Sequence, residues 1–132
     1  MSARSGPRRI VAGVLVRGPG VLLCRRRPDR NWYAGVWDLP GGHVEWRESL
    51  QEALVRELFE ELGVVVLTAL PQAEVTVSGA HLTVFLVSEW SGEPVNAAPE
   101  EHDLVGWFTA AEALDLHLAD DRLGQLILDL TR

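Results

Sequence analysis

Residues 41–64 read GGHVEWRESLQEALVRELFEELGV, and this stretch carries the strongest helix signal in the chain. Ser49 and Glu52 have the spacing of a capping box, in which the side chain of each residue bonds to the backbone of the other. Gly63 is typical of a helix C-terminus. Between these ends the apolar residues recur at helical spacing: Leu50, Ala53, Leu54, Leu58 and Leu62. We therefore predict a helix between Ser49 and Gly63.

Three glutamates in the second half of this helix lie on its apolar side. At about 100° per residue, Glu57, Glu60 and Glu61 share one sector about 100° wide, and apolar residues one to two turns earlier point the same way. A run of charges is usually a solvated helix face, but this placement directs the acids toward the core. Two carboxylates about 5 Å apart repel by roughly 3 kcal/mol at an effective dielectric of about 20. A divalent cation would neutralise the cluster, and carboxylate oxygens suit Mg²⁺.

The segments on either side of this helix are mainly strands. Apolar and β-branched runs predict a hairpin from residues 10–17 and 21–26, and a short extended piece at 37–39 that ends at Pro40-Gly41-Gly42. After the helix the expected strands are 64–70, 74–78, 81–90 and 104–108, followed by helices at 110–116 and 122–130. This order predicts an α/β (α+β) fold, in which a mixed sheet is covered by helices on both faces.

Length, charge and cysteine content narrow the class of protein. The 132 residues suit one compact domain, which we place at 9–132 after a flexible basic tail at 1–8. The formal net charge of −7 disfavours a nucleic-acid polymer as partner. No apolar run is long enough to cross a membrane and no secretory signal is evident. Cys24 is the single cysteine and is expected to pack in the core, so the expected compartment is the cytoplasm.

The glycines and acids together resemble the signature of the Nudix hydrolase superfamily. The match consists of Gly42, Glu48 after five residues, and the run from Arg56 to Val64 after seven more. Looser similarity to MutT-like nucleoside triphosphate pyrophosphohydrolases extends across most of the chain. One position departs from many members, which have a glycine where this chain has Arg47. We expect a changed loop conformation there at most.

The resemblance implies a fold, a cofactor and a set of roles. The fold is a Nudix-type α/β/α sandwich, and the cofactor is Mg²⁺, with Mn²⁺ as a possible substitute. The implied metal ligands are Glu57, Glu60, Glu61 and the backbone carbonyl of Gly41. Arg56 would orient the glutamates, and Glu48 would be a secondary ligand or the partner of Arg56. Glu101, with Glu100 behind it, would complete the site from a later loop, although a solvated loop is the alternative. Either Glu57 or Glu101 would be the general base.

The substrate contacts are expected just before the glycines. The resemblance points to Arg26 for a phosphate, and Leu39 and Gly42 are further candidates. Trp37, together with Trp32 and Tyr33, could stack on a base or belong to the core. His43 and His102 receive no metal role, because Mg²⁺ prefers oxygen ligands.

The implied reaction is hydrolysis of a nucleoside diphosphate linked to another group. No proline occurs in residues 72–93 and the only tyrosine is upstream, so the markers of ADP-ribose and dinucleoside polyphosphate hydrolases are absent. This favours conversion of an NTP or dNTP, oxidised or not, to NMP and pyrophosphate. The alternatives are another nucleoside diphosphate derivative, such as a nucleotide sugar or ADP-ribose, and a non-catalytic module that senses a nucleotide. The partner would be this small molecule, and the protein would be a monomer or a homodimer.

Overall fold

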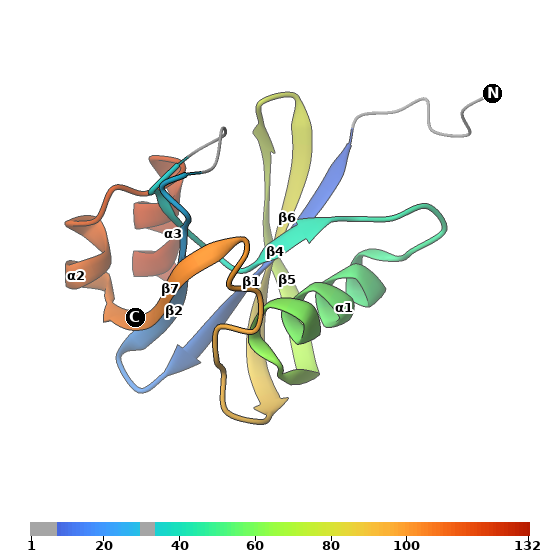
Figure 1. The fold of residues 1–132 in the computed structure, drawn as a ribbon, viewed down its shortest axis with the longest axis horizontal. Helices are drawn as coiled ribbons and strands as arrows, with labels where there is room; N and C mark the ends of the chain where they lie inside the picture. The colour runs from blue at the N-terminus through green and yellow to red at the C-terminus, as the bar shows by residue number, and fades with distance from the viewer. Residues whose placement is uncertain (1–7, 30–33) are drawn as a thin grey trace.

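The structure is a computed structural model that describes residues 8–29 and 34–132. The elements in chain order are β1 (Arg9–Arg17), β2 (Gly20–Arg26), β3 (Trp37–Asp38), β4 (Gly41–His43), α1 (Leu50–Leu62), β5 (Val65–Val77), β6 (Ala80–Ser91), β7 (His102–Thr109), α2 (Ala110–Leu114) and α3 (Arg122–Leu130) (Figure 1). The predicted tail at 1–8 lies outside the described residues except for Arg8.

The sheet is mixed, as the sequence predicts, and strand β1 lies at its centre. It pairs with β6 in parallel and with β2 and β4 in antiparallel orientation. Strand β5 pairs with β6 at one side, and β2 carries β3 and β7 at the other. The sheet therefore has two halves that meet at β1.

The predicted hairpin of β1 and β2 exists, but its strands separate soon after the turn. They pair only through Val16 with Val21 and Arg17 with Gly20. Beyond this point β2 follows β7, whereas β1 pairs with β6 and with the glycine-containing β4. The N–H of Gly13 donates to the carbonyl of Pro40 at 2.9 Å, which holds the chain before β4 against β1. The separation brings the glycine segment between the two halves of the sheet.

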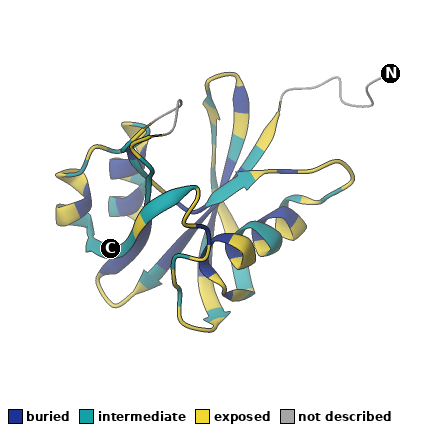
Figure 2. Cartoon of the chain, viewed as in Figure 1, coloured by how far each residue is buried: buried dark blue, intermediate teal, exposed yellow. Residues whose placement is uncertain are grey.

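Helix α1 covers one face of the sheet, and α2 with α3 covers the other (Figure 1). The middle of β1 is buried (Figure 2), and its alternate residues belong to two different cores. Val11 and Leu15 pack with Leu54 and Leu58 of α1, and Val14 packs with Ile127 of α3. The structure thus confirms a mixed sheet between helical layers.

Two parts of the sheet differ from the sequence prediction. The two strands expected at 64–70 and 74–78 form one strand, β5, which continues through Pro71 with register shifts around it. Proline is tolerated there because β5 is an edge strand and the ladder is bulged. Gly41 and Gly42, where the extended piece predicted at 37–39 ends, form strand β4 with His43 instead. Among the described residues, no helix has the length and apolar character needed to span a bilayer.

Candidate active site

Both predicted ends of α1 are confirmed. The Ser49 hydroxyl accepts from the N–H of Glu52 at 3.0 Å, and the N–H of Ser49 donates to Glu52 Oε1 at 2.8 Å. Gly63 takes the left-handed conformation with φ of 72°, and its N–H donates to the carbonyl of Phe59. The helix is fixed at both ends, so its acidic side chains project from a rigid support.

The three glutamates of α1 differ in burial. Glu61 is only 2% exposed, whereas the side chains of Glu57 and Glu60 are 17% and 54% exposed. The prediction that all three acids face the core is therefore confirmed for Glu61, holds in part for Glu57 and is wrong for Glu60. The three glutamates span about 100° of the helix surface. Glu60 lies at one edge of this sector, where the helix no longer contacts the sheet, so its side chain reaches solvent.

Arg56 connects the acids into one hydrogen-bonded group. Its guanidinium donates to both carboxylate oxygens of Glu48 at 2.7 and 2.9 Å. It also donates to Glu57 at 2.7 Å and to Glu60 at 3.0 Å. A further bond at 3.0 Å reaches the carbonyl of His43, which ties the helix to β4. Arg56 and Glu48 therefore have the mutual position that the sequence motif implies.

The two glycines of β4 lie directly against the acids. The N–H of Gly41 donates to Glu61 Oε1 at 3.3 Å. A Cβ atom on Gly42 would stand 2.4 Å from Glu57 Oε1, and one on Gly41 would stand 2.0 Å from the carbonyl oxygen of Val11. At Gly41 the obstacle is backbone, so only glycine fits there, whereas at Gly42 a side chain would have to displace the carboxylate of Glu57.

The electrostatics of the group show an excess of negative charge near Glu61. Burial and the neighbouring Glu57 raise the pKa of Glu61 well above its usual range. The Arg56 guanidinium, by contrast, lowers the pKa of Glu48 to about 2. Arg56 thus neutralises the outer acids more than the buried one. A set of carboxylate oxygens with one uncompensated buried member fits a hard divalent cation such as Mg²⁺.

Glu101 also lies near this group. It occupies a turn just before β7, where its N–H donates to the carbonyl of Ala98 and its own carbonyl accepts from the N–H of Arg27. Its charge contributes to the raised pKa of Glu61, which places it within electrostatic range of the buried acid. Glu100 is exposed. The structure brings Glu101, rather than Glu100, toward the acids of α1.

The candidate substrate contacts have mixed surroundings. Arg26 ends β2 and pairs with His102 of β7. Trp37 is half-buried and packs edge-to-face on Phe108, with ring centroids 4.9 Å apart. Leu39 is buried in the core on the α3 side. Trp32 and Tyr33 lie outside the described residues, and the substrate roles of this group stay predictions.

Three residues on strands β2, β3 and β7 were given no functional role by the sequence. Cys24 of β2 and His102 of β7 lie beside Glu61, and their potential ligand atoms fall within 4.8 Å of one another. Asp38 is paired with Cys24 across β2 and β3. Burial of the carboxyl and the charge of Asp120 raise the pKa of Asp38 to about 6. In the sequence, Asp38 is marked only by its position next to Leu39, a candidate substrate contact.

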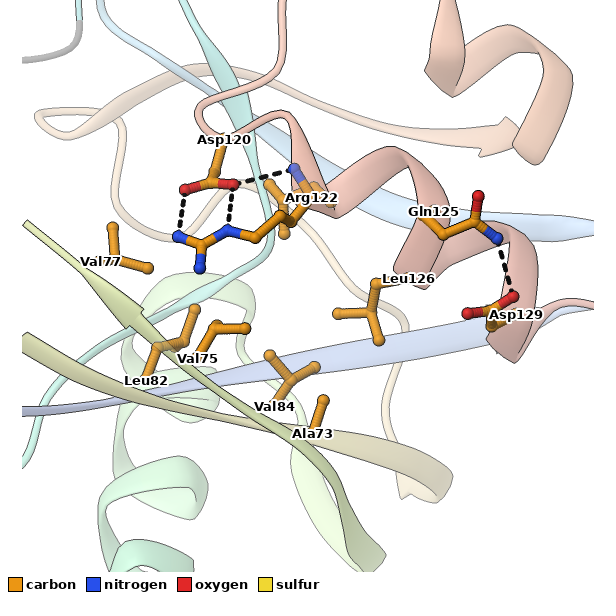
Figure 3. Close-up of a pocket in the computed structure, with 11 residues that line it drawn as sticks. Ala73, Val75, Val77, Leu82, Val84, Asp120, Arg122, Gln125, Leu126 and Asp129 are labelled. Carbon is orange, nitrogen blue, oxygen red and sulfur yellow. Dashed lines mark hydrogen bonds and ion pairs between the residues drawn. The ribbon is translucent and has the colours of Figure 1, made fainter.

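A groove of 270 Å³ lies on the other face of the sheet, between α3 and strands β5 and β6 (Figure 3). Its floor is apolar, with Val75, Leu82 and Val84. At its rim Arg122 forms an ion pair with Asp120 at 2.9 Å. The groove contains none of the acids of α1.

Comparisons with known proteins identify the family to which the chain is similar. A profile described as NUDIX domain matches residues 7–130. The chain is 37% identical over 114 residues to the CTP pyrophosphohydrolase of Escherichia coli, covering 83% of this chain and 82% of that protein. It is 32% identical over 110 residues to the 8-oxo-dGTP diphosphatase of Haemophilus influenzae, covering 80% and 78%.

Solved structures of proteins from the same family also resemble this chain. The crystal structure of a MutT NUDIX hydrolase from Burkholderia pseudomallei matches with a TM-score of 0.80 and 33% identity, covering 95% of this chain and 98% of that chain. The solution structure of the ORF135 protein of Escherichia coli matches with a TM-score of 0.75 and 33% identity, covering 95% and 91%. The region matched by the family profile includes every residue of the site described above.

Proposed function

Because the chain belongs to the Nudix hydrolase family, we propose that it hydrolyses an NTP or dNTP, in ordinary or oxidised form, to NMP and pyrophosphate. The observation that carries the proposal is the Arg56-centred group of carboxylates packed against Gly41 and Gly42. The relatives named for CTP and 8-oxo-dGTP support a triphosphate substrate.

The proposed cofactor is Mg²⁺, held by Glu57, Glu60, Glu61 and the backbone at Gly41. The donors are oxygens, and the buried Glu61 lies where a cation would relieve repulsion from Glu57. When bound, Mg²⁺ supplies neutralisation of the diphosphate charge and acts as a Lewis acid. Mn²⁺ has the same oxygen preference and is expected to substitute.

The side chains of the protein would do the remaining work. Arg56 holds Glu57 in place through the hydrogen bond at 2.7 Å, and Glu48 in turn holds Arg56. One carboxylate, Glu57 or Glu101, would accept the proton of the attacking water. The water oxygen bonds to phosphorus as the bridging P–O bond breaks, and pyrophosphate and NMP separate. Arg26, at the end of β2, is the proposed phosphate contact.

The first test is product identification by mass. The purified protein would be incubated with Mg²⁺ and a panel of NTPs, dNTPs, oxidised purine nucleotides, nucleotide sugars and ADP-ribose. Pyrophosphate and a monophosphate from a triphosphate would support the proposal and name the base. Cleavage of only the diphosphate derivatives would move the assignment to that class. Nucleotide binding without turnover would favour a sensing module.

The second test is Glu61→Gln, with Glu74→Gln as control. Glutamine resembles the protonated form of Glu61, so the metal-free protein should fold at least as stably as the wild type. Loss of one charged metal ligand should lower kcat about 100-fold or more and abolish the Mg²⁺-dependent rise in Tm. Glu74 is exposed on β5 and pairs with His81, so its variant should keep both properties. Full activity of Glu61→Gln would reject the metal site.

A further inference from the structure

Glu61 also belongs to a second group of side chains that could hold a metal ion. Cys24 from β2, Glu61 from α1 and His102 from β7 converge, and one ligand atom from each lies within 4.8 Å of the other two. His102 Nε2 is 3.9 Å from Glu61 Oε1. We propose that Cys24, His102 and Glu61 bind a borderline-soft divalent cation of the Zn²⁺ type, and that this cation competes with Mg²⁺ for Glu61.

The fold places these groups together for identifiable reasons. The β2–β7 ladder shifts register between Arg25 and Arg26, so that Arg26 pairs with His102 while Cys24 pairs with Val105. A bulge of this kind redirects the side chain at the end of a strand. Here it directs His102 to the side of the ladder where Cys24 meets the end of α1. The three residues therefore have a common, rigid support.

The donor set differs from the one proposed for Mg²⁺. Thiolate, imidazole and carboxylate are the usual ligands of Zn²⁺, with bonds of about 2.0 to 2.3 Å in tetrahedral geometry. Mg²⁺ takes oxygen ligands and has little affinity for sulfur or nitrogen. A tetrahedral site needs ligand atoms about 3.5 Å apart, so the side chains must close by roughly an ångström. A water molecule would take the fourth position.

The surroundings favour a cation at this point. Cys24 is fully buried, and the side chains of Glu61 and His102 are 3% and 14% exposed. Burial of the ligands keeps solvent away and strengthens their attraction for a metal ion. On binding, the Cys24 thiol would release its proton to solvent as the metal–sulfur bond forms.

Competition follows because Glu61 belongs to both sites. Its carboxylate cannot keep its position beside Gly41 while it also closes a tetrahedron with Cys24 and His102. A Zn²⁺-type ion should therefore inhibit the Mg²⁺-dependent reaction at concentrations far below that of Mg²⁺. This consequence rests on the proposed function, whereas metal binding itself does not.

The test is titration of the full chain with Co²⁺, a spectroscopic substitute for Zn²⁺, in excess Mg²⁺. The chain has a single cysteine, so a thiolate-to-cobalt charge-transfer band can come only from Cys24. We expect this band to saturate at one equivalent and to disappear when Zn²⁺ is added. Absence of the band in the folded wild-type protein would overturn the proposal, whether or not any nucleotide is hydrolysed.

Variants extend the test. Cys24→Ser and His102→Gln should each lower Zn²⁺ affinity about tenfold or more, whereas His81→Gln, an exposed histidine on β6, should not. For Cys24→Ser and His102→Gln, the Zn²⁺ concentration that halves the Mg²⁺-dependent activity of the variant should rise by the same factor as the loss of Zn²⁺ affinity. Equal inhibition of Cys24→Ser and the wild type would reject the competition. If Cys24→Ser does not fold, His102→Gln and the wild-type cobalt spectrum decide the question.

Discussion

Gly42 lies so close to Glu57 that a Cβ atom at position 42 would stand 2.4 Å from the Oε1 of this glutamate. Real Cβ contacts are never this short, so a side chain at position 42 must displace the carboxylate. The displaced group is the end of a flexible side chain rather than backbone. The position is therefore expected to control the placement of Glu57 more than the stability of the fold.

We expect Gly42→Ala to lower kcat about 10- to 100-fold, because about an ångström of displacement at a reacting centre can cost that much. The free energy of unfolding should change by only about 1 kcal/mol. Steady-state kinetics and urea denaturation measure the two effects. Gly20→Ala is the matched control, because its Cβ would meet its nearest neighbour at 3.5 Å. A Gly42→Ala enzyme with unchanged kcat would show that Glu57 does not need its present position.

The Glu48–Arg56 pair predicts a pH dependence of stability. Arg56 lowers the pKa of Glu48 from 4.5 to about 2, so the folded state favours the ionised carboxylate. The stabilisation is complete above the ordinary pKa and is lost as the pH falls toward 2. Glu48→Gln should therefore cost about 1–3 kcal/mol at neutral pH, and the difference from the wild type should shrink between pH 5 and pH 2.

Urea denaturation at a series of pH values checks this, with Glu93→Gln as control. Glu93 also pairs with an arginine, Arg17, but its side chain is 68% exposed, so its variant should change stability little. A Glu48→Gln difference that stays constant from neutral to acid pH would contradict the proposed role of the charge.

The sequence predicted the local part of the site well. A capping box and a C-terminal glycine determine where α1 begins and ends, and the helical spacing then places Arg56 beside Glu60. The pairing of Arg56 with Glu48 came only from the family resemblance. The burial difference between Glu60 and Glu61 could not be predicted, because it depends on where the sheet edge ends relative to the helix.

Long-range features were harder to foresee. Cys24 and His102 come together through a register shift between β2 and β7, and no local pattern signals such a bulge. The single strand β5 also differs from expectation, because Pro71 is a strong local sign of a break. Its position on an edge strand, where proline costs no sheet hydrogen bond, becomes evident only in the complete sheet.

Asp38 predicts a pH effect of the opposite sign. Its pKa is raised from 3.8 to about 6 by burial of the carboxyl and by Asp120, despite the hydrogen bond from the N–H of Leu39. The ionised form is therefore unfavourable in the folded state above about pH 6, and this cost disappears as the pH falls below the ordinary pKa. Since Asp38 also reaches solvent, screening reduces the size of the effect.

We expect Asp38→Asn to raise Tm at pH 8 and to have little effect at pH 4. The asparagine oxygen can still accept the bond from Leu39, which is 2.8 Å long in the wild type. Differential scanning calorimetry at the two pH values provides the measurement. Asp115→Asn, at an exposed position after α2, controls for general changes in net charge. An equal shift of Tm at both pH values would exclude the titration of Asp38 as the cause.

Arg47 adopts a backbone conformation suited to glycine, with φ of 68°. The sequence comparison led us to expect a changed loop, but the residue takes the left-handed region that a glycine enters freely. In the folded state a non-glycine residue is strained by about 1–2 kcal/mol in this region. Glycine removes this strain but loses more conformational entropy on folding, which costs about 0.5–1 kcal/mol. Arg47→Gly should therefore stabilise the protein by about 0.5–1 kcal/mol and raise Tm by a few degrees. Arg47→Ala is the control. It removes the guanidinium that lies over the Trp46 ring, as the glycine variant does, but it keeps the Cβ atom that causes the strain, so it should not be more stable than the wild type. Equal melting temperatures for the glycine and alanine variants would mean that backbone strain at position 47 has no effect on stability.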